Sequence, residues 1–136
     1  MAGFVTAFRI KMMKGFTAHV VRKPDSRSAH IPMATTAINV TYVDNELYII
    51  AIPSTGMAGS EIFHYVSGYT DPMNVTIVPQ HVLSSGSYTL SFVGINWGGP
   101  AGFKVSLTTN GVATPLSAPA SSAVGVVWTA NVAITV

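Results

Sequence analysis

The sequence contains no cysteine, and charged side chains are scarce through its second half. The absence of cysteine excludes disulfides, thiolate metal ligands and a cysteine nucleophile. Charged residues make up 9% of the 136 residues, against about a quarter of an average globular chain. After Asp71 the only charged side chain is that of Lys104. Stability must therefore come from apolar packing and backbone hydrogen bonds rather than from ion pairs or cross-links.

The sequence also has no run of about 18 uninterrupted apolar residues, the length that a membrane-spanning helix needs. Its first residues do not fit a signal peptide, because Arg9 and Lys11 interrupt the apolar run. We therefore expect a protein made soluble in the cytoplasm. A surface rich in Thr, Ser and Gly but poor in charge suits β-proteins that work outside cells, on membranes or in capsids. We expect it to act outside the producing cell.

Positive charge is concentrated at the N-terminus. Six of the seven Lys and Arg residues lie before position 28, against one acid, Asp25. A basic amphipathic helix in a membrane interface would fit part of this segment. A strand fits better, because it places Arg9 and Lys11 on the face opposite Phe4 and Phe8. The basic residues then either protect an edge strand from aggregation or contact an anionic membrane. The membrane- or anion-contacting candidates are Arg9, Lys11, Lys14, Arg22 and Lys23.

Alternation of apolar and polar residues dominates the rest of the chain and predicts β-strands. In 126–136, Val126 and Trp128 fall on one apolar face, and in 38–43 Tyr42 shares a face with Val40. Residues 47–52 are apolar on both faces, as in a strand covered on both sides. Further alternating segments are 73–77, 88–93 and 103–108. The pattern predicts an all-β, single-domain antiparallel β-sandwich of about eight to ten strands, or a flattened barrel. Residues 1–27 would form a basic N-terminal hairpin within it.

Short polar segments mark the turns. Asp44-Asn45 predicts a tight hairpin, and Asn110-Gly111 predicts a type I′ turn because both residues tolerate a positive φ. The carboxylates, Glu46 among them, are assigned mostly to turns. Longer loops are expected at 53–60, 67–72, 79–87 and 96–102, and an irregular crossover between sheets is expected at 114–123.

No pattern in the sequence defines an active site. Ser60 lies in Gly59-Ser60-Glu61, which lacks the rest of the nucleophile turn of serine hydrolases. The four histidines show none of the spacings typical of metal sites. We therefore expect a protein that is not an enzyme and that uses no metal or cofactor. A net charge of +2 is also too small to indicate a nucleic-acid partner.

Aromatic side chains gather around two Gly-containing turns, one at Trp97 and one at Ser67-Gly68. Exposed Trp and Tyr side chains bind sugar faces or the membrane interface. If both turns lie at one end of the sandwich, they form an aromatic rim. Alternatively, Trp97 folds over the core as a lid. Trp128, on a regular apolar face, is predicted to be core. The candidate ligand-binding residues are Trp97, Tyr65, Tyr69, Phe63, His64 and Asn96.

These observations favour a non-enzymatic, surface-binding β-sandwich that recognises a membrane or a glycan, such as a toxin component or a lectin-like module. The expected partners are membrane lipid or glycan, with a partner protein or a homo-oligomer also compatible. The alternative is a structural subunit of a virion, decoration or fibre assembly, in which subunit contacts would cover the weakly charged surface.

Overall fold

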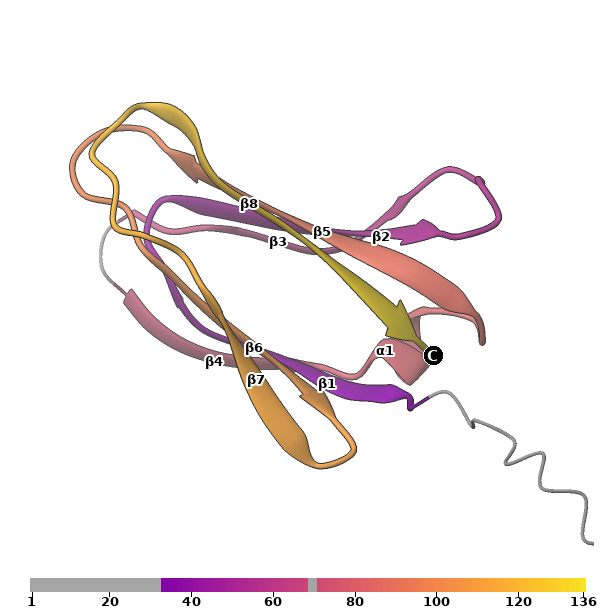
Figure 1. Ribbon diagram of the computed structural model, residues 1–136. Coiled ribbons are helices and arrows are strands. Elements are labelled where there is room, and N and C mark those ends of the chain that lie inside the picture. The colour runs from indigo at the N-terminus through magenta and orange to yellow at the C-terminus, as the bar shows by residue number, and fades with distance from the viewer. Residues whose placement is uncertain (1–32, 69–70) are drawn as a thin grey trace, which may run out of the picture. The chain divides into compact units, whose positions relative to one another are not determined.

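The computed structural model describes residues 33–68 and 71–136, which form a β-sandwich (Figure 1). The strands are β1 (Thr35–Val43), β2 (Glu46–Pro53), β3 (Ser60–Val66), β4 (Asp71–Ile77), β5 (Ser87–Asn96), β6 (Phe103–Thr109), β7 (Val112–Ser117) and β8 (Gly125–Thr135). The predicted all-β sandwich is confirmed. The predicted N-terminal hairpin, and the choice between strand and helix there, fall outside the described residues.

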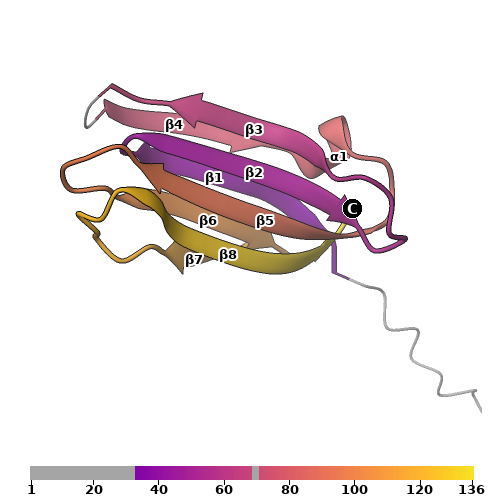
Figure 2. The ribbon, with the colours of Figure 1, turned by 90° about the horizontal axis from the view of Figure 1, so that it is seen from above.

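Two four-stranded antiparallel sheets form the layers. Sheet A has the order β4-β1-β6-β7, and sheet B has the order β3-β2-β5-β8. Figure 2 shows the strands of sheet B over those of sheet A. The sheets stay separate, so the flattened barrel is not formed. The links β1–β2, β3–β4, β4–β5, β5–β6 and β7–β8 pass between sheets, and only β2–β3 and β6–β7 stay within one, so five of seven links cross.

The core lies between the sheets and is built from the apolar faces that alternation predicts. Its fully buried side chains include Leu47 and Ile49 of β2 and Leu90 and Phe92 of β5. Strand β2 lies inside sheet B, between β3 and β5, as expected of a segment apolar on both faces. Trp128 is 6% exposed, and its ring lies 5.9 Å from that of Phe92. The prediction that Trp128 belongs to the core is confirmed.

Glycine makes room for the largest aromatic contact of this core. Gly94 of β5 lies opposite Trp128 of β8. A Cβ atom at Gly94 would lie 2.6 Å from the ring of Phe103. The ring of Phe103 in turn stacks on Trp128, with centroids 5.6 Å apart and planes inclined by 16°. A side chain at position 94 would therefore disturb the stack.

One of the two predicted turns joins strands in an unexpected way. Asn110 and Gly111 have φ angles of 52° and 75° and link β6 to β7 within sheet A, as their type I′ signal predicts. Asn45 also has a positive φ, of 78°, but β1 and β2 belong to different sheets. The hairpin predicted at Asp44-Asn45 is therefore wrong. A tight arch between the two sheets needs the same tolerance of positive φ as a hairpin. The residue types at Asp44-Asn45 therefore do not distinguish an arch from a hairpin.

Three elements occupy segments for which no strand or helix was predicted. Strand β3 includes Phe63, His64 and Tyr65, which precede the expected Ser67-Gly68 turn. Strand β7 takes the first part of 114–123, and helix α1 (Pro79–Val82) lies in 79–87. Pro115 suggested irregular structure, but β7 is an edge strand, where a missing backbone N–H is tolerated. No helix within the described residues is both long and apolar enough to span a membrane.

Two of the β-bulges overturn predicted side-chain faces, because an inserted residue turns the following side chains to the other face. In β1 the register shifts between Val40 and Tyr42, so Tyr42 lies opposite Lys104 on the outer face of sheet A. In sheet B the pairing shifts after Gly94, and Val126 is 61% exposed. The predictions that Tyr42 shares a face with Val40 and that Val126 shares a face with Trp128 are therefore wrong.

Candidate functional site

Four polar and aromatic side chains meet on the outer face of sheet B, at the end where β2 begins. Glu46 and Tyr48 are two residues apart on β2 and so lie on the same face. His64 of β3 lies directly opposite Tyr48. Trp97 immediately follows β5, and its indole reaches back to Glu46. We call Glu46, Tyr48, His64 and Trp97 the Glu46 cluster.

The Glu46 carboxylate holds the cluster together. Its Oε1 accepts a hydrogen bond from the Tyr48 hydroxyl at 2.6 Å and lies 2.8 Å from Nε2 of His64. Its Oε2 accepts a hydrogen bond from Nε1 of Trp97 at 3.1 Å. The rings of Tyr48 and His64 stack with centroids 4.0 Å apart. The Glu46 side chain is only 11% exposed, and these donors compensate for its desolvation.

The same hydrogen bonds shift the pKa values of two members. The Tyr48 hydroxyl, followed by His64, lowers the pKa of Glu46 below its ordinary 4.5, against the opposing effect of burial. The hydrogen bond to Glu46 raises the pKa of Tyr48 above its ordinary 10.0. At neutral pH the carboxylate is therefore ionised and the tyrosine keeps its proton, so the Tyr48 hydroxyl remains a donor.

Two asparagines fix the loop that carries Trp97. Oδ1 of Asn45 accepts a hydrogen bond from the backbone N–H of Trp97 at 2.9 Å. Asn96 is fully buried, and its Nδ2 donates to the carbonyls of Gly99 and Ala123 at 2.8 Å and 2.7 Å. Trp97 is thus held at its backbone and at its indole, yet it remains 54% exposed. It lies over Glu46 on the outer face and is not part of the hydrophobic core.

Apolar side chains flank the cluster in register. Val66 of β3 and Ile95 of β5 lie on either side of Glu46, and Val126 of β8 lies beyond Ile95. Val66 is 47% exposed and Val126 is 61% exposed. The cluster therefore interrupts an apolar row that runs across all four strands of sheet B.

The structure joins two of the predicted ligand-binding residues, Trp97 and His64, through Glu46. Phe63 and Tyr65 lie on the other face of β3, half-buried against the core, with their rings 6.4 Å apart. Asn96 shapes the Trp97 loop from a buried position. The predicted residues outside the described part of the chain are Tyr69, Arg9, Lys11, Lys14, Arg22 and Lys23.

Sequence reasoning missed Glu46 and Tyr48 as members of a site. Their spacing of two residues does place both on the same face of a strand, next to the turn. However, Glu46 contacts His64 and Trp97, which are 18 and 51 positions away. Only the pairing of β2 with β3 and β5 brings them together, and no local pattern encodes that pairing.

The cluster offers a fixed aromatic surface with a carboxylate, an imidazole and a phenol at its edge. Within residues 33–68 and 71–136, no group of three His, Asp or Glu side chains is placed to hold a metal ion. Comparison with known proteins finds no matching family model, no similar curated protein and no similar solved structure.

Proposed function

We propose that this protein is a non-enzymatic, glycan-binding β-sandwich and that a sugar ring stacks on Trp97. The observation that carries the proposal is that Trp97 is 54% exposed and yet is fixed by Oε2 of Glu46 and Oδ1 of Asn45. An exposed indole presents an apolar face to the C–H groups of a sugar. Fixing the ring before binding lowers the entropy lost in the complex.

The edge of the indole supplies polar partners for sugar hydroxyls. Oε2 of Glu46 accepts only one described hydrogen bond, from Trp97, and a carboxylate oxygen can accept two. The His64 side chain is 35% exposed and lies next to this carboxylate. A ligand that stacks on Trp97 therefore meets an acceptor and an imidazole within the same cluster.

The charges at this site favour a glycan over an anionic membrane. The ionised Glu46 carboxylate repels anionic headgroups, whereas membrane-binding surfaces gather Lys and Arg. Lys104 is the only Lys or Arg in residues 33–136, and it belongs to sheet A. Membrane binding would thus depend on the basic residues before position 28.

The exposed valines favour a second candidate, a structural subunit of a virion, decoration or fibre assembly. Val66 and Val126 extend the surface of the Glu46 cluster with apolar area. Centres of protein interfaces are depleted in charge and enriched in aromatic residues. In such an assembly another subunit would cover Trp97.

A glycan array with the full-length protein, followed by calorimetry on each hit, tests the first proposal. Trp97→Ala should weaken binding by about 1–3 kcal/mol, as expected of an aromatic hot spot, while the unfolding midpoint changes little. Val112→Ala is the matched control, because Val112 is 65% exposed on β7 of the other sheet. If no glycan binds and Trp97→Ala instead dissociates an oligomer in mass photometry, the structural candidate replaces the glycan proposal.

Fluorescence gives an independent test. The chain has two tryptophans, so Trp128→Phe leaves Trp97 as the only reporter. Acrylamide should quench Trp97 in the free protein, and a bound glycan should protect it. If acrylamide cannot quench Trp97 in the free, monomeric protein, both the glycan-binding and the structural-subunit candidates are contradicted.

A further inference from the structure

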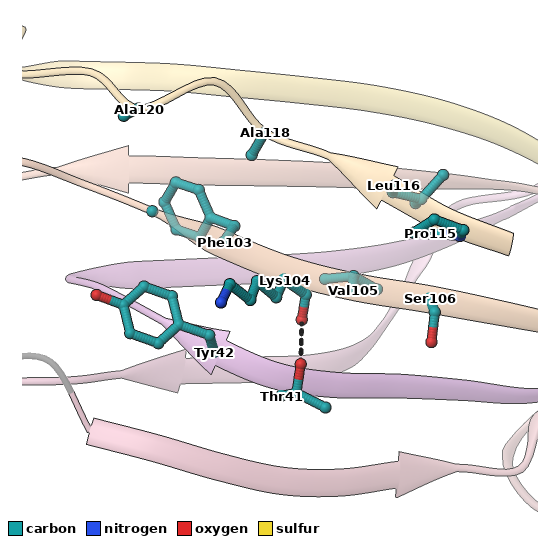
Figure 3. Close-up of a pocket in the computed structure, with 11 residues that line it drawn as sticks. Thr41, Tyr42, Phe103, Lys104, Val105, Ser106, Pro115, Leu116, Ala118 and Ala120 are labelled. Atoms are coloured by element: carbon teal, nitrogen blue, oxygen red, sulfur yellow. Dashed lines mark hydrogen bonds between the residues drawn. The ribbon is translucent and has the colours of Figure 1, made fainter. Parts of the chain in front are cut away.

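A hollow of about 430 Å³ opens beside β6 of sheet A, in the opposite layer from the Glu46 cluster. Pro115 of β7 lies opposite Ser106 and supplies apolar surface on the outer side of the sheet. Leu116 lies opposite Val105 and, with Ala118, lines the hollow from the side of the core. Tyr42 of β1 and Lys104 of β6 contribute an aromatic ring and a cation (Figure 3). We call this hollow the Lys104 pocket.

Lys104 has an unusual position for a cation in this chain. No other Lys or Arg follows Arg27, and no Asp or Glu follows Asp71. Within the described residues Lys104 forms no salt bridge with a carboxylate. The Lys104 ammonium instead lies 5.7 Å from the centre of the Tyr42 ring. Its N–H donors are therefore available to a ligand, and the ring stabilises the charge at this place.

The fold positions the cation and the ring together. The bulge in β1 turns Tyr42 to the outer face, opposite Lys104. Gly102 lets the ring lie close to the start of β6, since a Cβ atom there would be 3.0 Å from Cε1 of Tyr42. The Thr41 hydroxyl donates a hydrogen bond to the Lys104 carbonyl at 3.4 Å. Backbone pairing and side chains thus join β1 to β6 at the pocket.

We propose that the Lys104 pocket binds a small organic monoanion, with one carboxylate on an apolar body. The ammonium pairs with the carboxylate, and the exposed ring of Pro115 contacts the body. A single ammonium matches one negative charge, whereas phosphate sites usually supply several donors or the fork of an arginine. The volume lies within the range of about 300–1,000 Å³ found for small-molecule pockets. This proposal is independent of glycan binding at Trp97.

The test compares 4-phenylbutyrate with its neutral counterpart 4-phenylbutanol, using the ¹⁵N-labelled full-length protein and amide chemical shifts. The acid should shift the amides of Gly102, Lys104 and Ser106 in a saturable manner. It should bind about tenfold more tightly than the alcohol, because a hydrogen bond to a charged group is worth about that factor. Lys104→Gln should remove this difference by weakening the acid about tenfold, and Lys104→Arg should restore much of it.

The six basic residues before position 28 are unchanged in these variants. General attraction of anions by that segment therefore cannot explain weaker binding of the acid by Lys104→Gln than by the unmodified protein. Lys104 is exposed, and Lys104→Gln should unfold at the same urea concentration as the unmodified protein. Tyr42→Leu, which removes the ring, provides a second variant and should also weaken the acid. Equal binding of acid and alcohol, unchanged binding by Lys104→Gln, or no shift at the pocket amides would each overturn the proposal.

Discussion

Replacing Gly94 with alanine tests how tightly the core is built around Trp128. In a strand, alanine is ordinarily more stable than glycine by about 0.5–1 kcal/mol, because it loses less conformational entropy on folding. The structure predicts the opposite sign at position 94. The new Cβ atom would lie 2.6 Å from Cε2 and 2.7 Å from Cζ of Phe103, which is closer than carbon atoms approach without displacement.

The Phe103 ring has little space into which it can move. It is 4% exposed, and it stacks on Trp128 with 5.6 Å between centroids. Overpacking of this kind costs about 1–3 kcal/mol. After the usual gain from alanine is subtracted, we expect Gly94→Ala to lower the free energy of unfolding by about 1–2 kcal/mol.

Urea unfolding followed by tryptophan fluorescence and circular dichroism measures this effect. Gly86→Ala is the control, because its Cβ atom would meet only the Tyr88 ring, at an ordinary 3.6 Å, and it should leave stability unchanged or slightly higher. Adding Phe103→Leu to Gly94→Ala should cost less than the sum of the two single substitutions, since the smaller side chain relieves the overlap. A Gly94→Ala protein as stable as the unmodified one would refute the packing argument.

Three further predictions concern stability and one concerns binding. Trp128→Ala should lower the free energy of unfolding by about 3–5 kcal/mol, and a loss below about 1 kcal/mol in urea would contradict its core position. Asn96→Ala should cost about 1–3 kcal/mol by leaving loop carbonyls unpaired, and should increase acrylamide quenching of the exposed tryptophan. Because folding lowers the pKa of Glu46, its contribution is present above pH 4.5 and is lost as the pH falls through the lower folded value. Urea titrations from pH 6 to pH 3 should therefore show a flatter pH dependence for Glu46→Gln, and identical curves would contradict this assignment. Neutralising the basic residues before position 28 should weaken binding to anionic vesicles by roughly 1 kcal/mol per charge, and unchanged binding accompanied by aggregation would indicate edge protection instead.

Side-chain faces could be predicted wherever a strand runs without a bulge. In β6 the alternation of Phe103 and Val105 with Lys104 and Ser106 matches the observed burial. The sequence pattern fails for Tyr42 and for the start of β8. A bulge is defined by the pairing with the partner strand, so the sequence of the bulged strand alone does not reveal it. The sequence therefore predicts strands more reliably than it predicts their outward surfaces.

The candidate site shows the same limit. The glycines after Trp97 left two alternatives open, an exposed ring or a lid over the core, and the ring is 54% exposed. His64 stood out beside a turn. Glu46, which connects them, could not be recognised because its neighbours depend on sheet order. Interpreting Asp44-Asn45 as a hairpin would place β2 beside β1, whereas the structure places it between β3 and β5. Whether that turn forms a hairpin or an arch between the sheets determines which residues can contact the Glu46 carboxylate.

The five links that pass between layers also determine how the chain can reach its folded state. Strand β1 pairs only with β4 and β6, and sheet B is not complete until β8 pairs with β5. During synthesis, the early apolar strands must therefore wait for partners that emerge much later. Proteins dominated by pairings between strands far apart in the sequence fold in about milliseconds to seconds rather than microseconds. Unpaired strands exposed over that time can associate between molecules. Because β1 and β5 both need partners that follow them in the sequence, residues 33–136 should fold cooperatively only after β8 is made.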